Sequence, residues 1–400
     1  MRRIFTKDIT KDITKNLPWT RRIDVFLVVL ALIGIGFHMA AEATRILKPQ
    51  PHMLEKTQAA TCAVRCFEAI RQARMGTPAA LDAESDPAST GLVGQEFTQT
   101  TTDRGVLEAK LTSINPNFAA LFVQYFYDIG LKAGDPVAIS FTGSFPALNI
   151  CMLAAAEELN LKPICITSVG ASMWGANDPK FTWLDMETYL SRQRLLKTTS
   201  VAASLGGSND RGRTLSPMGR GLLSEAIKRN GAELLYERTL EEAVQQRISI
   251  FNRDAGERGI RAYVNIGGGV ASIGNSQNGR LIQPGLNRVL KPYNWAQRGA
   301  LHYYAKDRIP IIHILNIDAL AGMHGFPVAP GVVPAVGEGT IYHKESYDLK
   351  IVIPLLLVYM ILCFRVLRAR QRAVKSAREV STPAPVAAIA DQPAGERRGG

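Results

Sequence analysis

The 400-residue sequence is long enough for one large hydrophobic core or two smaller ones, and its 46% hydrophobic and 20% charged residues are typical of a folded protein. The net charge of +12 is concentrated at the ends: residues 1–22 carry seven Lys or Arg against two Asp, and residues 365–400 carry eight against three acidic residues. Residues 42–348 hold 31 basic and 29 acidic residues. A nucleic-acid-binding protein would need a basic stripe on this folded body, so we expect no nucleic-acid partner.

Each basic end adjoins a long apolar run. Val25–Ala41 (VFLVVLALIGIGFHMAA) is about as long as a membrane-spanning helix, and Ile351–Phe364 (IVIPLLLVYMILCF) reaches that length with the apolar residues at its ends. We therefore predict transmembrane helices at 23–41 and 349–367.

The charge distribution also predicts the orientation of the chain. The positive-inside rule places both basic ends in the cytoplasm, as an even number of spans permits. The predicted domains are a cytoplasmic segment 1–22, the two spans in the lipid bilayer, an extracytoplasmic body 42–348 and a basic tail 368–400 that is disordered in its Ala- and Pro-rich part. This describes a two-pass protein of a bacterial inner membrane. A cleaved signal peptide is the alternative for the first run, because A-x-A follows it at Ala41.

The body begins with Met53–Met75, which has helical composition and is expected to continue the first membrane helix outward, and with Thr77–Gly105, which has the composition of a long loop. Apolar runs then alternate with helical segments. The expected strands are Val137–Thr142, Pro163–Ser168, Ser200–Leu205, Arg261–Ile266 and Ile309–Ile317. This alternation predicts an α/β fold with a mostly parallel sheet of about five strands and helices on both faces. The ligand of such a sheet usually binds at the carboxyl ends of the strands.

The stretch YVNIGGGVASIGN breaks from a strand into three glycines, Gly267, Gly268 and Gly269. It is not the dinucleotide fingerprint G-x-G-x-x-G, because Ser272 occupies the place of the third glycine, and it is not a P-loop, because Asn275 occupies the place of the lysine. We therefore expect no nucleotide cofactor. The glycines either let the backbone approach a ligand closely or only allow a sharp turn.

The stretch SFTGSFPALNI forms a strand-to-helix turn that contains Gly143 and Ser144. Ser144 could act as a nucleophile, bind an anion together with the helix N-terminus, or cap the helix that starts near Pro146. The nucleophile elbow G-x-S-x-G is absent, because Pro146 replaces its last glycine.

Polar side chains also follow three other strands. ITSVGASMWGANDP and GGSNDRGR offer hydroxyl, amide, carboxylate and guanidinium groups, and His313 in the last strand is a possible general base, although a strand histidine is more often a core residue. The candidate catalytic residues are Ser144, Asp178 and His313. The candidate ligand-binding residues are Gly143, Ser144, Ser168, Ser172, Asn177, Asp178, Gly207, Arg211, Arg213, Gly267, Gly268 and Gly269. No Cys or His spacing indicates a metal site or a disulfide framework.

Taken together, the basic start, the anchor helix, FTGSFPALN, ITSVGASMWGANDP, NIGGGVASIG, the late GFPVAPG and the closing apolar helix resemble the poly-gamma-glutamate system protein family. The resemblance spans about residues 20–365. It implies a role in the biosynthesis or export of this anionic capsule-type polymer, with the poly-γ-glutamate ligase and its membrane companion proteins as partners. It implies no catalytic residues.

Three functions follow as alternatives. The favoured one is an accessory subunit whose extracytoplasmic α/β domain binds or guides the polymer, because Arg211, Arg213 and glycine-rich backbone amides suit a carboxylate-rich chain. The second is a hydrolase or transferase that acts on γ-glutamyl bonds through Ser144 or a His/Asp pair. The third is a sensor that binds a small polar ligand and signals through its two membrane helices.

Overall fold

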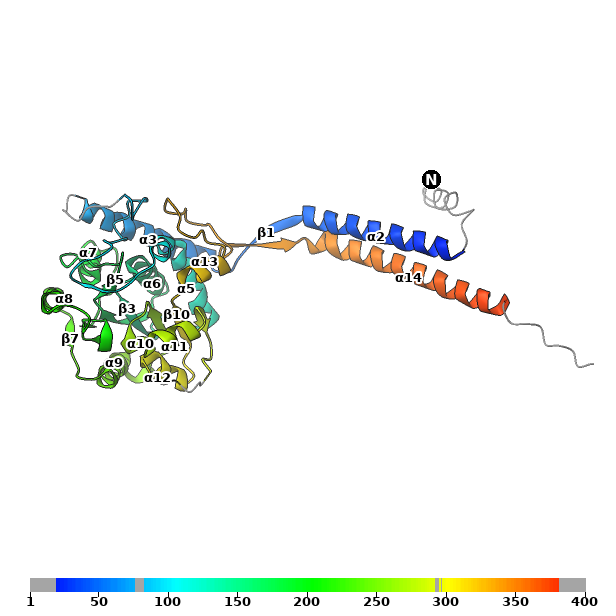
Figure 1. Ribbon diagram of the computed structural model, residues 1–400. Coiled ribbons are helices and arrows are strands. Elements are labelled where there is room, and N and C mark those ends of the chain that lie inside the picture. The colour runs from blue at the N-terminus through cyan, green and yellow to red at the C-terminus, as the bar shows by residue number, and fades with distance from the viewer. Residues whose placement is uncertain (1–18, 76–82, 292–294, 296, 381–400) are drawn as a thin grey trace, which may run out of the picture. The chain divides into compact units, whose positions relative to one another are not determined.

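The computed structural model describes residues 19–75, 83–291, 295 and 297–380. The chain forms two compact units (Figure 1). The terminal unit consists of Met1–Lys48 and Glu345–Gly400, and the body consists of Pro49–Lys344.

The terminal unit contains two long apolar helices, α2 (Trp19–Ala43) and α14 (Leu349–Val380), which run side by side (Figure 1). Their segments Val25–Ala43 and Leu349–Arg372 have mean hydropathies of 2.1 and 2.3 and are long and apolar enough to cross a membrane. A Cβ added at Gly34 on α2 would lie 2.9 Å from the hydroxyl of Tyr359 on α14. The absence of a side chain at this position therefore lets the two helices approach closely.

Helix α14 extends into the segment 368–400. The helix continues through the first part of segment 368–400, as far as Val380, because its Ala, Arg, Gln and Lys residues are strong helix formers. Residues 381–400 and 1–18 lie outside the described residues. Strands β1 (Arg45–Pro49) and β11 (His343–Tyr347) pair with each other and connect the two units along the chain.

The helix expected to extend the first membrane span is instead part of the body. It is α3 (Met53–Arg74), which is separated from α2 by β1. Small side chains at Ala59, Ala60 and Ala63 are fully buried where α3 packs against α5 (Asn117–Asp128) and α6 (Pro146–Glu158). This face is too tightly packed in protein to extend a lipid-facing helix.

The body is built on a seven-stranded sheet in the order β7-β6-β4-β3-β8-β10-β9. All neighbouring strands are parallel except β9, which pairs antiparallel with β10. The strands are β3 (Pro136–Thr142), β4 (Lys162–Ser168), β6 (Ala202–Ser204), β7 (Glu233–Leu235), β8 (Ala262–Ile266), β9 (Gly285–Asn287) and β10 (Ile311–Ile314). The five expected strands and the α/β class are confirmed, and β7 and β9 are additional edge strands.

Helices cover both faces of the sheet. Along β3, Val137, Ile139 and Phe141 pack into the core formed with α3, α5 and α6, whereas Ala138 packs into the core on the other face. The second core includes Val244 and Phe251 of α9. The remaining helices and short strands of the body are β2 (Thr101–Asp103), α4 (Leu107–Ser113), β5 (Ala171–Ser172), α7 (Trp183–Arg192), α8 (Pro217–Arg229), α9 (Leu240–Ala255), α10 (Val270–Ile273), α11 (Ser276–Leu281), α12 (Ala300–Lys306) and α13 (Ile317–Met323), with short 3-10 turns at Ser208–Asp210 and Gly256–Arg258.

The strand order creates a crevice between β3 and β8. The chain runs from β3 outward through β4, β6 and β7, and then returns to the opposite side of β3 to form β8 and β10. The loops that leave the carboxyl ends of β3 and β8 therefore turn toward opposite faces of the sheet. Such a switch point is where open α/β sheets bind their ligands.

Candidate functional site

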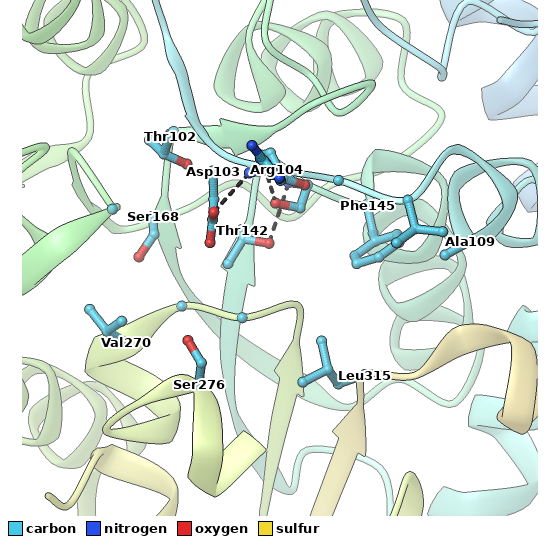
Figure 2. A pocket seen from close by; sticks show the side chains of 18 of the residues that line it. Thr102, Asp103, Arg104, Ala109, Thr142, Phe145, Ser168, Val270, Ser276 and Leu315 are labelled. Atoms are coloured by element: carbon cyan, nitrogen blue, oxygen red, sulfur yellow. Dashed lines mark hydrogen bonds between the residues drawn. The ribbon is translucent and has the colours of Figure 1, made fainter. Parts of the chain in front are cut away.

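A cavity of about 680 Å³ lies at this carboxyl edge of the sheet. The ends of β3, β4, β8 and β10 contribute to one wall, and the segment from Thr102 to Lys110 forms the opposite wall. Figure 2 shows Thr102, Asp103 and Arg104 on one side of the cavity and Val270, Ser276 and Leu315 on the other. The volume is in the range of pockets that bind small molecules or short polymer segments.

Six of the residues proposed from the sequence line this cavity. They come from loops after four different strands, and they are Ser144, Ser168, Ser172, Gly207, Gly268 and Gly269. The structure thus brings these four glycine- and serine-rich loops together.

Gly143 and Gly267 make close backbone approaches beside the cavity. A Cβ added at Gly143 would lie 2.5 Å from the carbonyl oxygen of Val169, and one added at Gly267 would lie 2.1 Å from Oγ1 of Thr142. Gly267 also has a φ of +90°, a conformation that side chains disfavour. The first glycine after β8 is therefore required for the turn itself, whereas Gly268 and Gly269 line the cavity.

The other proposed residues lie outside the lining of the cavity. Asn177 is buried, where its Oδ1 accepts a hydrogen bond from the Gln95 backbone at 3.1 Å, and it fastens the loop before β2. Asp178 faces Arg74, with 3.8 Å between carboxylate and guanidinium. Both residues hold the polar loop after β4 against the N-terminal part of the body.

The two arginines of GGSNDRGR also do not line the cavity. Arg211 donates a hydrogen bond to the carbonyl oxygen of Arg238 at 3.2 Å, and its guanidinium lies 4.5 Å from the centre of the Tyr236 ring. Arg213 is exposed. The structure therefore does not bring these cations together with the glycine loop after β8.

His313 is fully buried in the middle of β10. Its Nε2 donates to the carbonyl oxygen of Gly279 at 3.0 Å, so Nδ1 is the acceptor for the side-chain amide of Asn265 at 3.2 Å. Burial lowers the pKa of His313 to about 4, which keeps the ring neutral. Asn265 also donates to the carbonyl oxygen of Gly267 at 2.8 Å, so this histidine supports the glycine turn from within the core.

A buried ion pair lies beneath Ser168. The Asp210 carboxylate accepts hydrogen bonds from Oγ of Ser168 at 2.8 Å and from Nη2 of Arg247 at 2.7 Å, and Arg247 also donates to Oγ of Ser204 at 2.6 Å. Both charged side chains are 1% exposed. The pair joins the ends of β4 and β6 to α9 and gives the loop after β6 a structural role.

Lys110 on α4 is a further polar group of this cavity, and no sequence pattern predicted it. Its side chain is buried with 3% exposure, and Nζ donates to the carbonyl oxygen of Ser144 and lies 2.9 Å from Oγ of Ser172. Nζ also lies 4.0 Å from the centre of the Phe145 ring. Burial lowers the pKa of Lys110 to about 7. The only signal in the sequence is a lysine within an apolar helix turn, which is not specific.

Ser144 organises the surroundings of this lysine. Its backbone carbonyl accepts from Lys110, and its Oγ accepts a hydrogen bond from the backbone N–H of Ser172 at 3.1 Å. The residue that precedes α6 is Phe145, and Ser144 does not cap that helix. Of the three roles considered for Ser144, capping is therefore not the one observed.

The charges around the cavity are mixed. Asp103, Arg104 and Asp318 line it together with Lys110, and Oδ1 of Asp318 accepts a hydrogen bond from Thr112 at 2.8 Å. Among the described residues, no group of three or more His, Cys, Asp or Glu side chains could hold a metal ion. The lining suits a polar ligand with hydrogen-bonding amides and a limited number of charges.

Comparison of the chain with protein-family models, with curated proteins and with solved structures finds no match in any of the three.

Proposed function

We propose that this protein is a two-pass protein of a bacterial inner membrane whose extracytoplasmic body binds γ-linked polyglutamate during its biosynthesis or export. The observation that carries the proposal is the cavity at the β3/β8 switch point, lined by hydroxyls, glycine backbone and Arg104. Amide and carboxylate groups of such a chain would find donors and acceptors there. The resemblance to the poly-gamma-glutamate system protein family supplies the identity of the polymer.

The membrane part of the proposal rests on the two terminal helices. Both are long and apolar enough to cross a bilayer, and Lys and Arg residues are enriched outside them at both ends of the chain. With both ends cytoplasmic, the body and its cavity face the side to which a capsule polymer is exported. The poly-γ-glutamate ligase and its membrane companions are the proposed partners in that layer.

Arg104 is the cation best placed to meet a ligand carboxylate, because its side chain is exposed and it lines the cavity. A bidentate pair between this guanidinium and a carboxylate of the polymer would orient the polymer without burying a net charge. This differs from the sequence-based proposal, in which Arg211 and Arg213 would hold the polymer.

Binding of defined poly-γ-glutamate chains to the full-length protein in detergent micelles, measured by calorimetry at two salt concentrations, tests the proposal. We expect salt-sensitive binding that Arg104→Ala weakens by at least about tenfold, since a hydrogen bond to a charged group contributes about 1.5–3 kcal/mol. The matched control Arg213→Ala should bind like the wild type. Equal loss in both variants would place the polymer outside the cavity, and equal affinity for free glutamate would favour the sensor.

A further inference from the structure

Ser172 and Lys110 have the arrangement of a nucleophile and its general base. The two side chains come from separate elements, β5 and α4, and their polar atoms lie 2.9 Å apart at the wall of the cavity. Hydrogen-bond contact between a hydroxyl and a base is the geometric requirement for activating a serine. Serine paired with lysine is one of the ways in which proteins meet it.

The surroundings of Lys110 favour the neutral amine that a base requires. Within the part of the chain that the structure describes, none of the ion pairs includes Lys110. The nearest partners of Nζ are two neutral oxygens and the Phe145 ring. Burial without a carboxylate partner disfavours the ammonium form, and a pKa of about 7 leaves a large share of the amine unprotonated at neutral pH.

The other charged side chains near Lys110 are few. Asp103 and Arg104 precede α4, Asp318 lies at the start of α13, and Glu108 lies on α4 itself and is exposed. The carboxylate of Asp318 already accepts a hydrogen bond from Thr112.

Ser144 orients both members of the pair. A neutral Nζ that donates an N–H to the Ser144 carbonyl has its lone pair free to accept the hydroxyl proton of Ser172. The Oγ of Ser144 meanwhile holds the backbone N–H of Ser172 at 3.1 Å. A third group that fixes base and nucleophile is the usual support of an activated serine.

We propose that Ser172 and Lys110 are the nucleophile and general base of an acyl-transfer site that acts on amide bonds bound in the cavity. Oγ of Ser172 attacks the amide carbonyl carbon while its proton passes to Nζ of Lys110, and the C–N bond then breaks as that proton is delivered to the leaving amine. Water attacks the resulting ester and gives one proton to Lys110. The ester C–O bond breaks, and the proton returns to Ser172. An amine in place of water would complete a transfer.

Two other buried polar groups of the body do not offer this chemistry. His313 and the pair Asp210–Arg247 have protein partners and do not line the cavity. Only the identity of the substrate, a γ-glutamyl amide, rests on the proposed function.

The pair can be tested without that substrate by using diisopropyl fluorophosphate on the full-length protein in detergent. An activated serine displaces fluoride from phosphorus and passes its proton to the base, which leaves a covalent adduct that peptide mass spectrometry locates. We expect one adduct, on Ser172, that forms about tenfold faster at pH 8 than at pH 6 as Lys110 loses its proton. Ser172→Ala should give no adduct, while Ser191→Ala, on α7 outside the cavity, should label normally.

Substitution of the base separates catalysis from packing. Lys110→Met should slow labelling at least about a hundredfold, the usual contribution of a general base, and Lys132→Met on the surface should not. If Lys110→Met does not fold, Lys110→Arg carries the test, since it retains a donor but cannot lose its proton. An unlabelled wild type, an adduct on another serine, or normal labelling of folded Lys110 variants would overturn the proposal.

Incubation with poly-γ-glutamate then tests the substrate separately. Chains shortened by the wild type but not by Ser172→Ala identify the γ-glutamyl amide as the substrate. Labelled Ser172 with intact, unbound chains would contradict the proposed polymer and not the catalytic pair. Bound chains without labelling would contradict the pair and leave polymer binding in place.

Discussion

Gly267 lies so close to Thr142 that a Cβ added to the glycine would be 2.1 Å from the threonine Oγ1. This contact joins the carboxyl ends of β3 and β8 at the crevice where the cavity opens. It also explains why the run of three glycines begins where it does.

Gly267→Ala is therefore expected to destabilise the body. The positive φ and the overlap with Thr142 should together lower the free energy of unfolding by about 2–4 kcal/mol. Gly268→Ala is the matched control, because the space around Gly268 is open and its φ is not positive. Urea unfolding followed by circular dichroism measures both, and similar losses at the two positions would contradict this account of the turn.

Because Asp210 and Arg247 form a buried ion pair, we expect substitutions of the two residues to have non-additive effects on the free energy of unfolding. Arg247→Met leaves a buried carboxylate without its cation and should cost about 3–5 kcal/mol of unfolding free energy. Asp210→Asn combined with Arg247→Met should recover part of that loss, because no unpaired charge remains buried. Arg253→Met, in an ion pair at the surface, is the control and should change stability little. Additive losses in the double variant would refute the coupling.

Because His313 is buried as a neutral ring, we expect it to cause a loss of stability in acid. Its folded-state pKa of about 4 lies below the ordinary value of 6.5, so its contribution is present above pH 6.5 and is lost as the pH falls toward 4. The contribution of His313 to the free energy of unfolding is up to about 3 kcal/mol. His302 has the same direction of shift, also from burial, and contributes to the same window. His313→Asn should flatten the dependence of unfolding free energy on pH, relative to wild type, between pH 6.5 and pH 4.

For Glu187 we expect the opposite trend, a contribution to stability that is lost as the pH rises. It is buried on α7, where it accepts hydrogen bonds from the N–H and hydroxyl of Ser200 at 2.8 and 3.0 Å, and burial raises its pKa to about 8. A raised acid pKa stabilises the fold below the ordinary pKa near 4.5, and this contribution is lost as the pH rises toward 8.

Glu187→Gln should therefore gain stability relative to wild type by about 1.4 kcal/mol per pH unit between pH 5 and pH 7.5. Unfolding measured over this range checks the slope. Glu237→Gln serves as a surface control, and equal slopes for the wild type and Glu187→Gln would show that Glu187 does not hold its proton.

The sequence predicted the main strands well because each is an apolar run bounded by turn residues. β7 and β9 were not predicted, since three residues at a sheet edge leave no periodic pattern; Glu233 and Leu234 are even exposed. The bounds of α3 agree with the expected helix Met53–Met75, but its place in the body was not predicted, because helical composition does not reveal which partner a helix packs against. The two long apolar helices near the chain ends, by contrast, were indicated clearly by hydropathy.

The site was predicted only in part. The rule that ligands bind at strand ends selected Ser144, Ser168 and Ser172, which line the cavity, because the rule depends on topology and the strand pattern indicated that topology. Lys110 could not be found in this way, since its role arises from burial beside residues distant in the chain. Arg211 was chosen by its charge alone, and its stacking on Tyr236 is a tertiary contact that no local pattern indicates.

The short pairing of β2 with β5 sets Asp103 beside Ser172, and Lys110 follows on α4, 62 residues before the serine that it contacts. Contacts between distant residues form late, because a long loop must close before they are made. The helix that carries the lysine precedes β3 and β4 in the chain, whereas Ser172 follows both strands. The proposed pair is therefore expected to form only when the segment from α4 to β5 has folded, and an incompletely folded body would lack it.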